Sequence, residues 1–169
     1  MTIDTTKSST HYRNELLVQH NRTMSRSEHE WTFEHSIVCA VDAQFAWNFW
    51  TTVSNWALDK DVESIDIDGP FAAGTRGVAH TKSSGRIEWR IVDAGAGTAI
   101  IEFPLTSAVG RVFWTFEKEA GRTRITQRFT LEGESAQEYV KLVGPVLATS
   151  IPEGMQKLCK AIESAARSS

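Results

Sequence analysis

The sequence lacks the features that mark several common classes of protein. It holds no apolar run long enough for a membrane span or for the core of a signal peptide. Its basic and acidic residues are interspersed and nearly cancel, at a net charge of −3, so we expect no nucleic-acid partner. Its apolar fraction of 41% and charged fraction of 23% are typical of a globular chain, and 169 residues suffice for one domain.

Cysteine is scarce. The two cysteines, Cys39 and Cys159, lie far apart and belong to no CxxC or Cys/His cluster, so we expect no metal site. We interpret them as buried thiols of a protein localised to the reducing cytoplasm, with a single disulfide as the alternative.

Motifs for nucleophilic catalysis, metal catalysis or nucleotide binding are also missing, and we expect no cofactor. The stretch GPFAAGTRG, residues 69–77, has the glycine spacing of a phosphate-binding loop. However, Thr75 and Arg76 follow Gly74 where such a loop needs a lysine, and the next residues have a strand pattern instead of starting a helix. We therefore expect a hairpin loop between two strands, with Gly69 and Gly74 in unusual backbone conformations.

Residues 1–29 are rich in Ser, Thr, Asn and charged side chains, which predicts a flexible N-terminal leader. Within it, NELLV (residues 14–18) could form one helical turn that docks on the remainder of the chain. We place a single ligand-binding domain at residues 30–169.

The pattern of the remaining chain is strand, short helices, strands, long helix. Residues 31–41 alternate apolar and polar side chains, Asp42 is a candidate N-cap, and the aromatic spacing that follows predicts one or two short helices up to Trp56. Six short strand-like runs then follow, separated by glycine-containing turns, which favours an antiparallel meander over alternating βα units. From Ser135 to about Ala166 the period is helical, with Pro145 and Pro152 expected to bend the helix.

These elements predict an α+β domain in which a curved seven-stranded antiparallel sheet is covered by a long C-terminal helix, with two short helices. A strongly curved sheet that grips one helix encloses a space between them. The predicted architecture is therefore a container.

Several stretches carry a family resemblance: VDAQFAWNFWTTVSNW, IDIDGPFAAGTRG, GRTRITQRFTLEG and LVGPVLATSIPEGMQKLCKAIESAA. In this order and spacing they resemble the SRPBCC superfamily (START-like, birch-pollen-allergen-like), in its polyketide cyclase/dehydrase and lipid transport branch, over residues 31–166. The resemblance implies a helix-grip fold with an internal hydrophobic cavity. It does not choose between carriers, cyclases and other members, because one fold serves many functions.

Three polar residues are candidates for catalysis. His35 lies on the apolar side of the first strand, where a neutral imidazole can exchange a proton with a bound phenol or ketone; the alternative is a core histidine, bonded to a backbone carbonyl or covered by the leader. Gln127 interrupts the apolar face of the last strand, and either orients a ligand or bonds to the helix backbone. Glu102 is a candidate only if it points inward with Glu88 and Arg90; we favour the outward orientation for all three.

The aromatic and apolar residues of the predicted faces either form plain core or line the cavity. The ligand contacts that we expect are Phe33, Ile37, Phe71, Trp89, Phe103, Trp114, Phe116, Phe129, Leu142 and Met155.

The function that we expect is reversible binding of a small hydrophobic or aromatic molecule, such as a lipid, isoprenoid or polyketide. One alternative is a polyketide cyclase or dehydratase that confines its substrate and uses His35 for acid–base chemistry. Another is a protein–protein interaction module, which would have a filled core and an exposed apolar patch. Nothing in the sequence indicates the oligomeric state.

Overall fold

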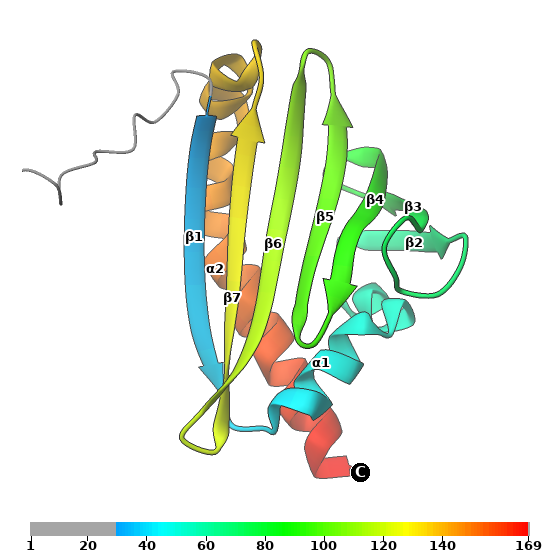
Figure 1. Cartoon of the computed structure of the whole chain (residues 1–169), viewed down its shortest axis with the longest axis vertical. Coiled ribbons are helices and arrows are strands. Elements are labelled where there is room, and N and C mark those ends of the chain that lie inside the picture. Colours follow the sequence, from blue (N-terminus) through cyan, green and yellow to red (C-terminus); the bar gives the residue numbers. More distant parts are fainter. Residues whose placement is uncertain (1–29, 169) are drawn as a thin grey trace, which may run out of the picture.

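The computed structural model describes residues 30–168, in which a curved sheet wraps one side of a long helix (Figure 1). The leader predicted at residues 1–29, and the NELLV turn within it, lie outside the described residues. No helix of the described part is long and apolar enough to cross a membrane.

The sheet has seven strands in the order β1-β7-β6-β5-β4-β3-β2, and every neighbouring pair is antiparallel. The predicted meander is confirmed: strands β2 to β7 follow one another both in sequence and in space, and β1 closes the order beside β7. The strands are β1 (Glu30–Cys39), β2 (Val62–Ile67), β3 (Arg76–Thr81), β4 (Gly85–Gly95), β5 (Thr98–Leu105), β6 (Ala108–Glu119) and β7 (Arg122–Glu132).

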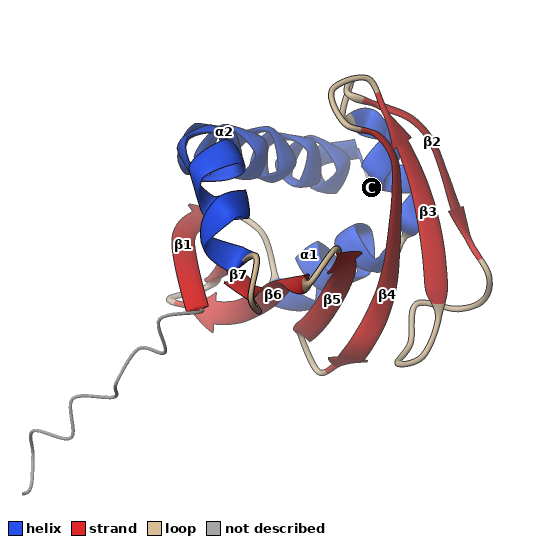
Figure 2. Ribbon diagram, turned by 90° about the horizontal axis from the view of Figure 1, so that it is seen from above, coloured by secondary structure: helices blue, strands red, loops and turns tan. Residues whose placement is uncertain are grey.

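Three helical elements accompany the sheet: α1 (Ala43–Thr51), the 3₁₀ helix η1 (Val53–Leu58) and α2 (Ala136–Ser168). The Asp42 side chain accepts hydrogen bonds from the backbone N–H groups of Gln44 and Phe45, which confirms it as the N-cap of α1. Helix α2 continues through Pro145 and Pro152. It faces the concave side of the sheet and packs mainly on β1 (Figure 2).

The face of the sheet that looks toward α2, called here the inner face, is identified by Cys39, which is bonded to Cys159 of α2. Because side chains alternate along a strand, Phe33, His35 and Ile37 share this face with Cys39. Direct cross-strand pairing extends it to β7, β6, β5 and β4 through Gln127, Trp114, Ala99, Ile101 and Ile91. Glu88, Arg90 and Glu102 alternate with inward residues, so they point outward, in the orientation that we favoured.

An aromatic cluster fills the end of the molecule where α1 meets the sheet. Trp50 is its centre: the Trp50 ring centroid lies 4.9 Å from that of Trp114, 5.4 Å from that of Phe116 and 5.7 Å from that of Trp56. Trp50 is only 4% exposed. Aromatic pairs at these separations add stabilisation beyond their buried area, so this cluster anchors α1 and η1 to the sheet.

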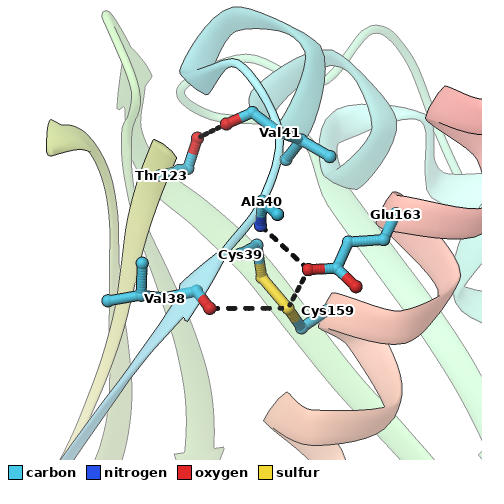
Figure 3. The surroundings of a disulfide bond; sticks show 7 residues. All are labelled: Val38, Cys39, Ala40, Val41, Thr123, Cys159 and Glu163. Carbon is cyan, nitrogen blue, oxygen red and sulfur yellow. Dashed lines mark hydrogen bonds between the residues drawn. A yellow bond between two sulfur atoms is a disulfide. The ribbon is translucent and has the colours of Figure 1, made fainter. Parts of the chain in front are cut away.

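The two cysteines are joined in a disulfide that links the end of β1 to the second half of α2 (Figure 3). Our thiol interpretation is therefore wrong and the alternative is correct. The Glu163 side chain, one turn further along α2, accepts a hydrogen bond of 2.8 Å from the backbone N–H of Ala40 beside the disulfide. A second contact, between the Thr123 hydroxyl and the Val41 carbonyl at 2.8 Å, holds the same junction to β7. Cytoplasmic localisation stays a prediction.

Residues 68–75 form the predicted loop between β2 and β3. Gly74 has a φ of 91°, as expected, whereas Gly69 does not have a positive φ, so the prediction for Gly69 is wrong. The loop turns its Phe71 side chain inward, where its ring centroid lies 5.2 Å from that of Trp50 and 6.2 Å from that of Trp56. The loop is thus part of the aromatic cluster.

Candidate functional site

A pocket of about 520 Å³ opens between the second half of α2 and the segment formed by α1, η1 and the start of β2. The disulfide fixes one wall, because the lining residues of α2 lie within five positions of Cys159. The pocket is lined by Phe49, Trp50, Asn55, Trp56, Leu58, Asp59, Lys60, Val62, Gly154, Lys157, Leu158 and Ala161.

The walls of the pocket are mainly aromatic and aliphatic, and two side-chain hydrogen bonds join η1 to the end of α1. The Trp56 indole N–H donates to the Trp50 carbonyl at 2.7 Å, and the Asn55 side-chain amide donates to the Phe49 carbonyl at 2.8 Å. These bonds satisfy carbonyls at the end of α1 that have no partner within the helix. These hydrogen bonds hold the aromatic wall in one arrangement.

Charged side chains gather at one side of this pocket. Asp59, Lys60 and Lys157 contribute two positive charges and one negative charge to an otherwise apolar lining. Pockets for small molecules commonly combine a large apolar surface with a few polar groups that fix orientation. The arrangement suits an apolar or aromatic molecule that carries an acidic or hydroxyl group.

His35 and Gln127 lie directly opposite each other on β1 and β7, both on the inner face, and Gln127 is in turn paired with Trp114 of β6. All three side chains are half-buried. Within residues 30–168, neither His35 nor Gln127 has a hydrogen-bond or ion-pair partner. Within these residues, the His35 side chain therefore does not bond to a backbone carbonyl. The other form of the core-histidine alternative, cover by the leader, lies outside the described residues.

The pocket and this polar pair are linked through two tryptophans. Trp50 lines the pocket, and its ring contacts Trp114, the cross-strand neighbour of Gln127. The half-buried aromatic side chains Phe33 and Phe129 form the next cross-strand pair beyond His35 and Gln127. The inner face thus carries a polar pair within an aromatic surface, and the contact between Trp114 and Trp50 connects this surface to the pocket.

Comparison with known proteins identifies the architecture. No family model matches the sequence, and no curated protein matches it significantly. Solved structures do match. An aromatase/cyclase, ZhuI from Streptomyces sp. R1128, superposes with a TM-score of 0.68 over 80% of this chain and 94% of its own, at 15% identity. Norcoclaurine synthase from Thalictrum flavum gives a TM-score of 0.65 over 98% and 97% of the two chains, at 13% identity. Ara h 8.0201 gives 0.59 over 83% and 99%, at 16% identity.

The chain has the helix-grip fold of the Bet v 1-like, or SRPBCC, proteins. This confirms the fold that the sequence resemblance implied. At such low identity the likeness establishes the fold and leaves the ligand open.

In this helix-grip chain, the residues that line the pocket differ from the predicted ligand contacts. None of the ten predicted ligand contacts is among its lining residues, because the pocket lies where α1 and η1 meet α2, whereas seven of the ten predicted residues lie on the strands. Phe71, Trp89 and Trp114 stand behind its aromatic wall, since their rings contact Trp50 or Trp56. For the strand residues, contact with a ligand stays a prediction.

Leu142 is a correction. It was predicted to face the ligand, but 73% of it is exposed on α2. The buried stripe of this helix runs through Gly144, Ile151, Met155 and Cys159, and Leu142, two positions before Gly144, points to the opposite side. Met155, by contrast, lies on the stripe and is 1% exposed.

Glu102 points outward, in the orientation that we favour, so it does not share a site with His35 and Gln127. It lies on the outer face, yet it is only 8% exposed, since arginines from both neighbouring strands cover it. The Arg90 Nε atom donates to one carboxylate oxygen at 2.8 Å and the Arg111 Nε atom to the other at 2.9 Å. Burial acts to raise the pKa of Glu102, but the hydrogen bonds and charges of Arg111 and Arg90 outweigh it and hold the pKa below the ordinary value. Glu102 is thus the centre of a structural ion-pair network.

Trp50, Asn55, Trp56 and Leu158 line the pocket but are not among the residues predicted from the sequence, although the two tryptophans were expected on the short helices. Two tryptophans within seven residues of a short helical segment were the available signal, because such large side chains need a partner surface. Within residues 30–168, no group of His, Cys, Asp and Glu side chains could hold a metal ion.

Proposed function

We propose that this protein reversibly binds a small, mainly apolar or aromatic molecule, of the lipid, isoprenoid or polyketide kind, in the pocket between α2 and the α1–η1 segment. The observation that carries the proposal is the pocket itself: about 520 Å³, walled by Phe49, Trp50, Trp56 and Leu158, and held by the disulfide and the indole hydrogen bond. This volume lies within the range of small-molecule sites.

The binding free energy would come from the apolar walls. Each ligand methylene that leaves water contributes about 0.8 kcal/mol, and a planar ring gains further from contact with the indoles. Because the walls are held in place by hydrogen bonds, little ordering cost opposes binding. Lys60 and Lys157 would attract the acidic or hydroxyl end of the ligand, while Asp59 disfavours a second negative group.

The experiment is a fluorescence titration with two probes, 1-anilinonaphthalene-8-sulfonate and the neutral 1-naphthol. Ala161→Trp fills the pocket, whereas Ser164→Trp adds the same side chain at an exposed position on α2 and is the matched control. We expect the wild type and Ser164→Trp to bind both probes, and Ala161→Trp to bind them at least about tenfold more weakly, a loss of about 1.4 kcal/mol. Equal affinity of all three proteins would overturn the proposal.

A second candidate function is supported by the polar pair on the inner face. His35 and Gln127 are direct cross-strand neighbours without a polar partner in residues 30–168, as expected of groups that await a substrate. Two of the similar structures are an aromatase/cyclase and norcoclaurine synthase, and for the latter a complex with dopamine and hydroxybenzaldehyde is known. In this chain, confinement would bring two carbonyl-bearing arms of one substrate together, and His35 would move the proton of an aldol closure.

The test of this second function is cyclisation of a short linear triketone by the wild type and by His35→Ala and Gln127→Ala. If the protein is a cyclase, His35→Ala abolishes turnover while the affinity for 1-naphthol changes little. Turnover that is unchanged in His35→Ala would remove His35 from the mechanism, and no turnover by the wild type would leave ligand binding as the function of the fold.

A further inference from the structure

The first half of α2 presents an apolar surface to solvent. Three of its large side chains are well exposed: Leu142 (73%), Val146 (63%) and Val143 (36%). Pro145 and Ala148 are also exposed, so five of the seven residues in the run LVGPVLA (residues 142–148) form this surface, called here the α2 patch. A helix that is apolar on all sides is normally covered on all sides.

The second half of the same helix behaves differently. Beyond Pro152, its exposed positions are occupied by polar side chains, and only its inward stripe is apolar: the exposed set is Glu153, Gln156, Lys157, Lys160, Ser164, Arg167 and Ser168. The apolar outer surface is thus confined to the turns nearest the start of α2. This distribution indicates that something covers the first turns of α2 only, because the outer surface of the later turns is polar.

The chain enters the described domain beside this patch. Glu30, the first described residue, is paired with Glu132, only four residues before α2 begins. The neighbouring Trp31 ring lies 3.8 Å from the position that a Cβ atom on Gly144 would occupy, so β1 starts against the inward side of the patch-bearing turns. The 29 residues that precede Glu30 are therefore tethered next to the patch.

We propose that residues 14–18 of this N-terminal segment, NELLV, dock on the α2 patch in cis. Leu16, Leu17 and Val18 form the segment's one run of three large apolar side chains. The twelve residues from Val18 to Glu30 can span about 40 Å, whereas the patch lies only about 9–18 Å along α2 from its start. Glu15 before the leucines is opposite in charge to Lys141 beside the patch.

The size of the patch favours this occupant over a second copy of the chain. A stable interface between two proteins buries roughly 800 Å² on each partner and involves about 20–30 residues on a side. The patch has five exposed residues. A tethered turn needs far less area, because the tether supplies an effective concentration in the millimolar range.

The test uses the full chain with a nitroxide label at Gln19→Cys; the native cysteines are joined and do not react. We expect the label to broaden the methyl signals of Leu142, Val143 and Val146. The methyls of Leu58 and Val92, which are exposed elsewhere on the domain, serve as the control. In the Leu16→Ser/Leu17→Ser variant with the same label, broadening of the patch signals should fall to the level of the control methyls.

Two outcomes would overturn the proposal. Broadening that is equal at the patch and at Leu58 and Val92, or unchanged by the two serines, would mean that the leucines do not dock there. Broadening that appears when a labelled chain is mixed with an unlabelled, methyl-visible chain would assign the patch to a second copy. Because both changes leave residues 30–168 unaltered, loss of folding does not confuse either result.

Discussion

On the outer face of the sheet, the Glu102 carboxylate accepts hydrogen bonds from arginines on both neighbouring strands, and Arg111 continues the network to Glu132. The Glu102 side chain is 10% exposed, so these interactions are less screened by water than ordinary surface pairs. Replacing Glu102 leaves two arginines without their shared partner. The residue therefore contributes to stability, and not to the chemistry that an inward orientation would have given it.

We predict that Glu102→Gln lowers the free energy of unfolding at pH 7 by about 1–3 kcal/mol, the cost of breaking a partly buried charged hydrogen bond. Chemical denaturation measures it. The control is Glu88→Gln, whose carboxylate pairs with Arg86 at the exposed surface and should cost less than about 1 kcal/mol. Equal losses in the two variants would contradict the network's role.

The same carboxylate makes a defined contribution to the pH dependence of stability. Its pKa is lower in the folded protein than its ordinary value of 4.5, so it stabilises the fold above that pH, and this contribution is lost as the pH falls through the folded-state pKa. The wild type should therefore lose stability more steeply than Glu102→Gln on acidification below about pH 4.5. Parallel pH profiles for the two proteins would show that the lowered pKa does not contribute.

Gly77 illustrates a packing requirement at one residue. The Trp89 ring lies across it, with ring atoms 2.1 to 2.4 Å from the position that a Cβ atom would occupy. We predict that Gly77→Ala displaces the indole and costs about 1–3 kcal/mol, as overpacking usually does. Because Trp89 packs on Trp56 of the pocket wall, the near-ultraviolet circular dichroism should change as well.

The control for this variant is Gly95→Ala on β4, where nothing lies within 4 Å of the added atom. It should stay within about 0.5 kcal/mol of the wild type. If both alanines cost the same, strand propensity, and not contact with Trp89, would account for the loss.

At the scale of elements, the disulfide is the strongest tie between α2 and the sheet. It joins residues 120 positions apart, so it removes much of the freedom of the unfolded chain. We predict that Cys39→Ser/Cys159→Ser lowers the free energy of unfolding by about 2–5 kcal/mol under non-reducing conditions. The difference should disappear when both proteins are measured with a thiol reductant. Equal stability without reductant would mean that the two sulfurs are not bonded in solution.

The same tie matters for the pocket, because four of its lining residues, from Gly154 to Ala161, come from the part of α2 that Cys159 fixes. Helix α1 and η1 supply the opposite wall, held by Asp42 at one end and by the Trp56 indole at the other. The pocket thus lies between α2, which the disulfide ties to β1, and the α1–η1 segment, which is held by its own hydrogen bonds.

At the scale of the molecule, the sequence predicted the architecture well because its signals were local. Alternation from Trp31 to Cys39 indicated β1, glycine-containing turns separated the meander, and Asp42 indicated the start of α1. The order of these elements leaves few topologies, and the helix-grip fold is the one that gives the long helix a sheet to cover.

The site was harder to predict, because it depends on contacts between distant residues. The sequence pattern predicted that His35 and Gln127 lie on the inner face. Only the register between β1 and β7 shows that they are directly opposite each other. Leu142 was assigned to the wrong side because residues 142–148 are apolar on both sides of α2, so the sequence does not mark which side is buried. Glu102 is covered by arginines that strand alternation cannot pair with it. The lining of the pocket by Trp50, Trp56 and Leu158 follows from how α2 crosses α1, which has no sequence signature.

The proposed occupant of the space between α2 and the α1–η1 segment is an apolar small molecule. The most direct measurement is of intermolecular nuclear Overhauser effects between the ring protons of bound 1-naphthol and the methyl groups of the protein. We expect contacts to Leu58, Val62 and Leu158, which line the pocket. Contacts only to Leu142, Val143 and Val146 on the exposed α2 patch, or no contacts at all, would contradict it.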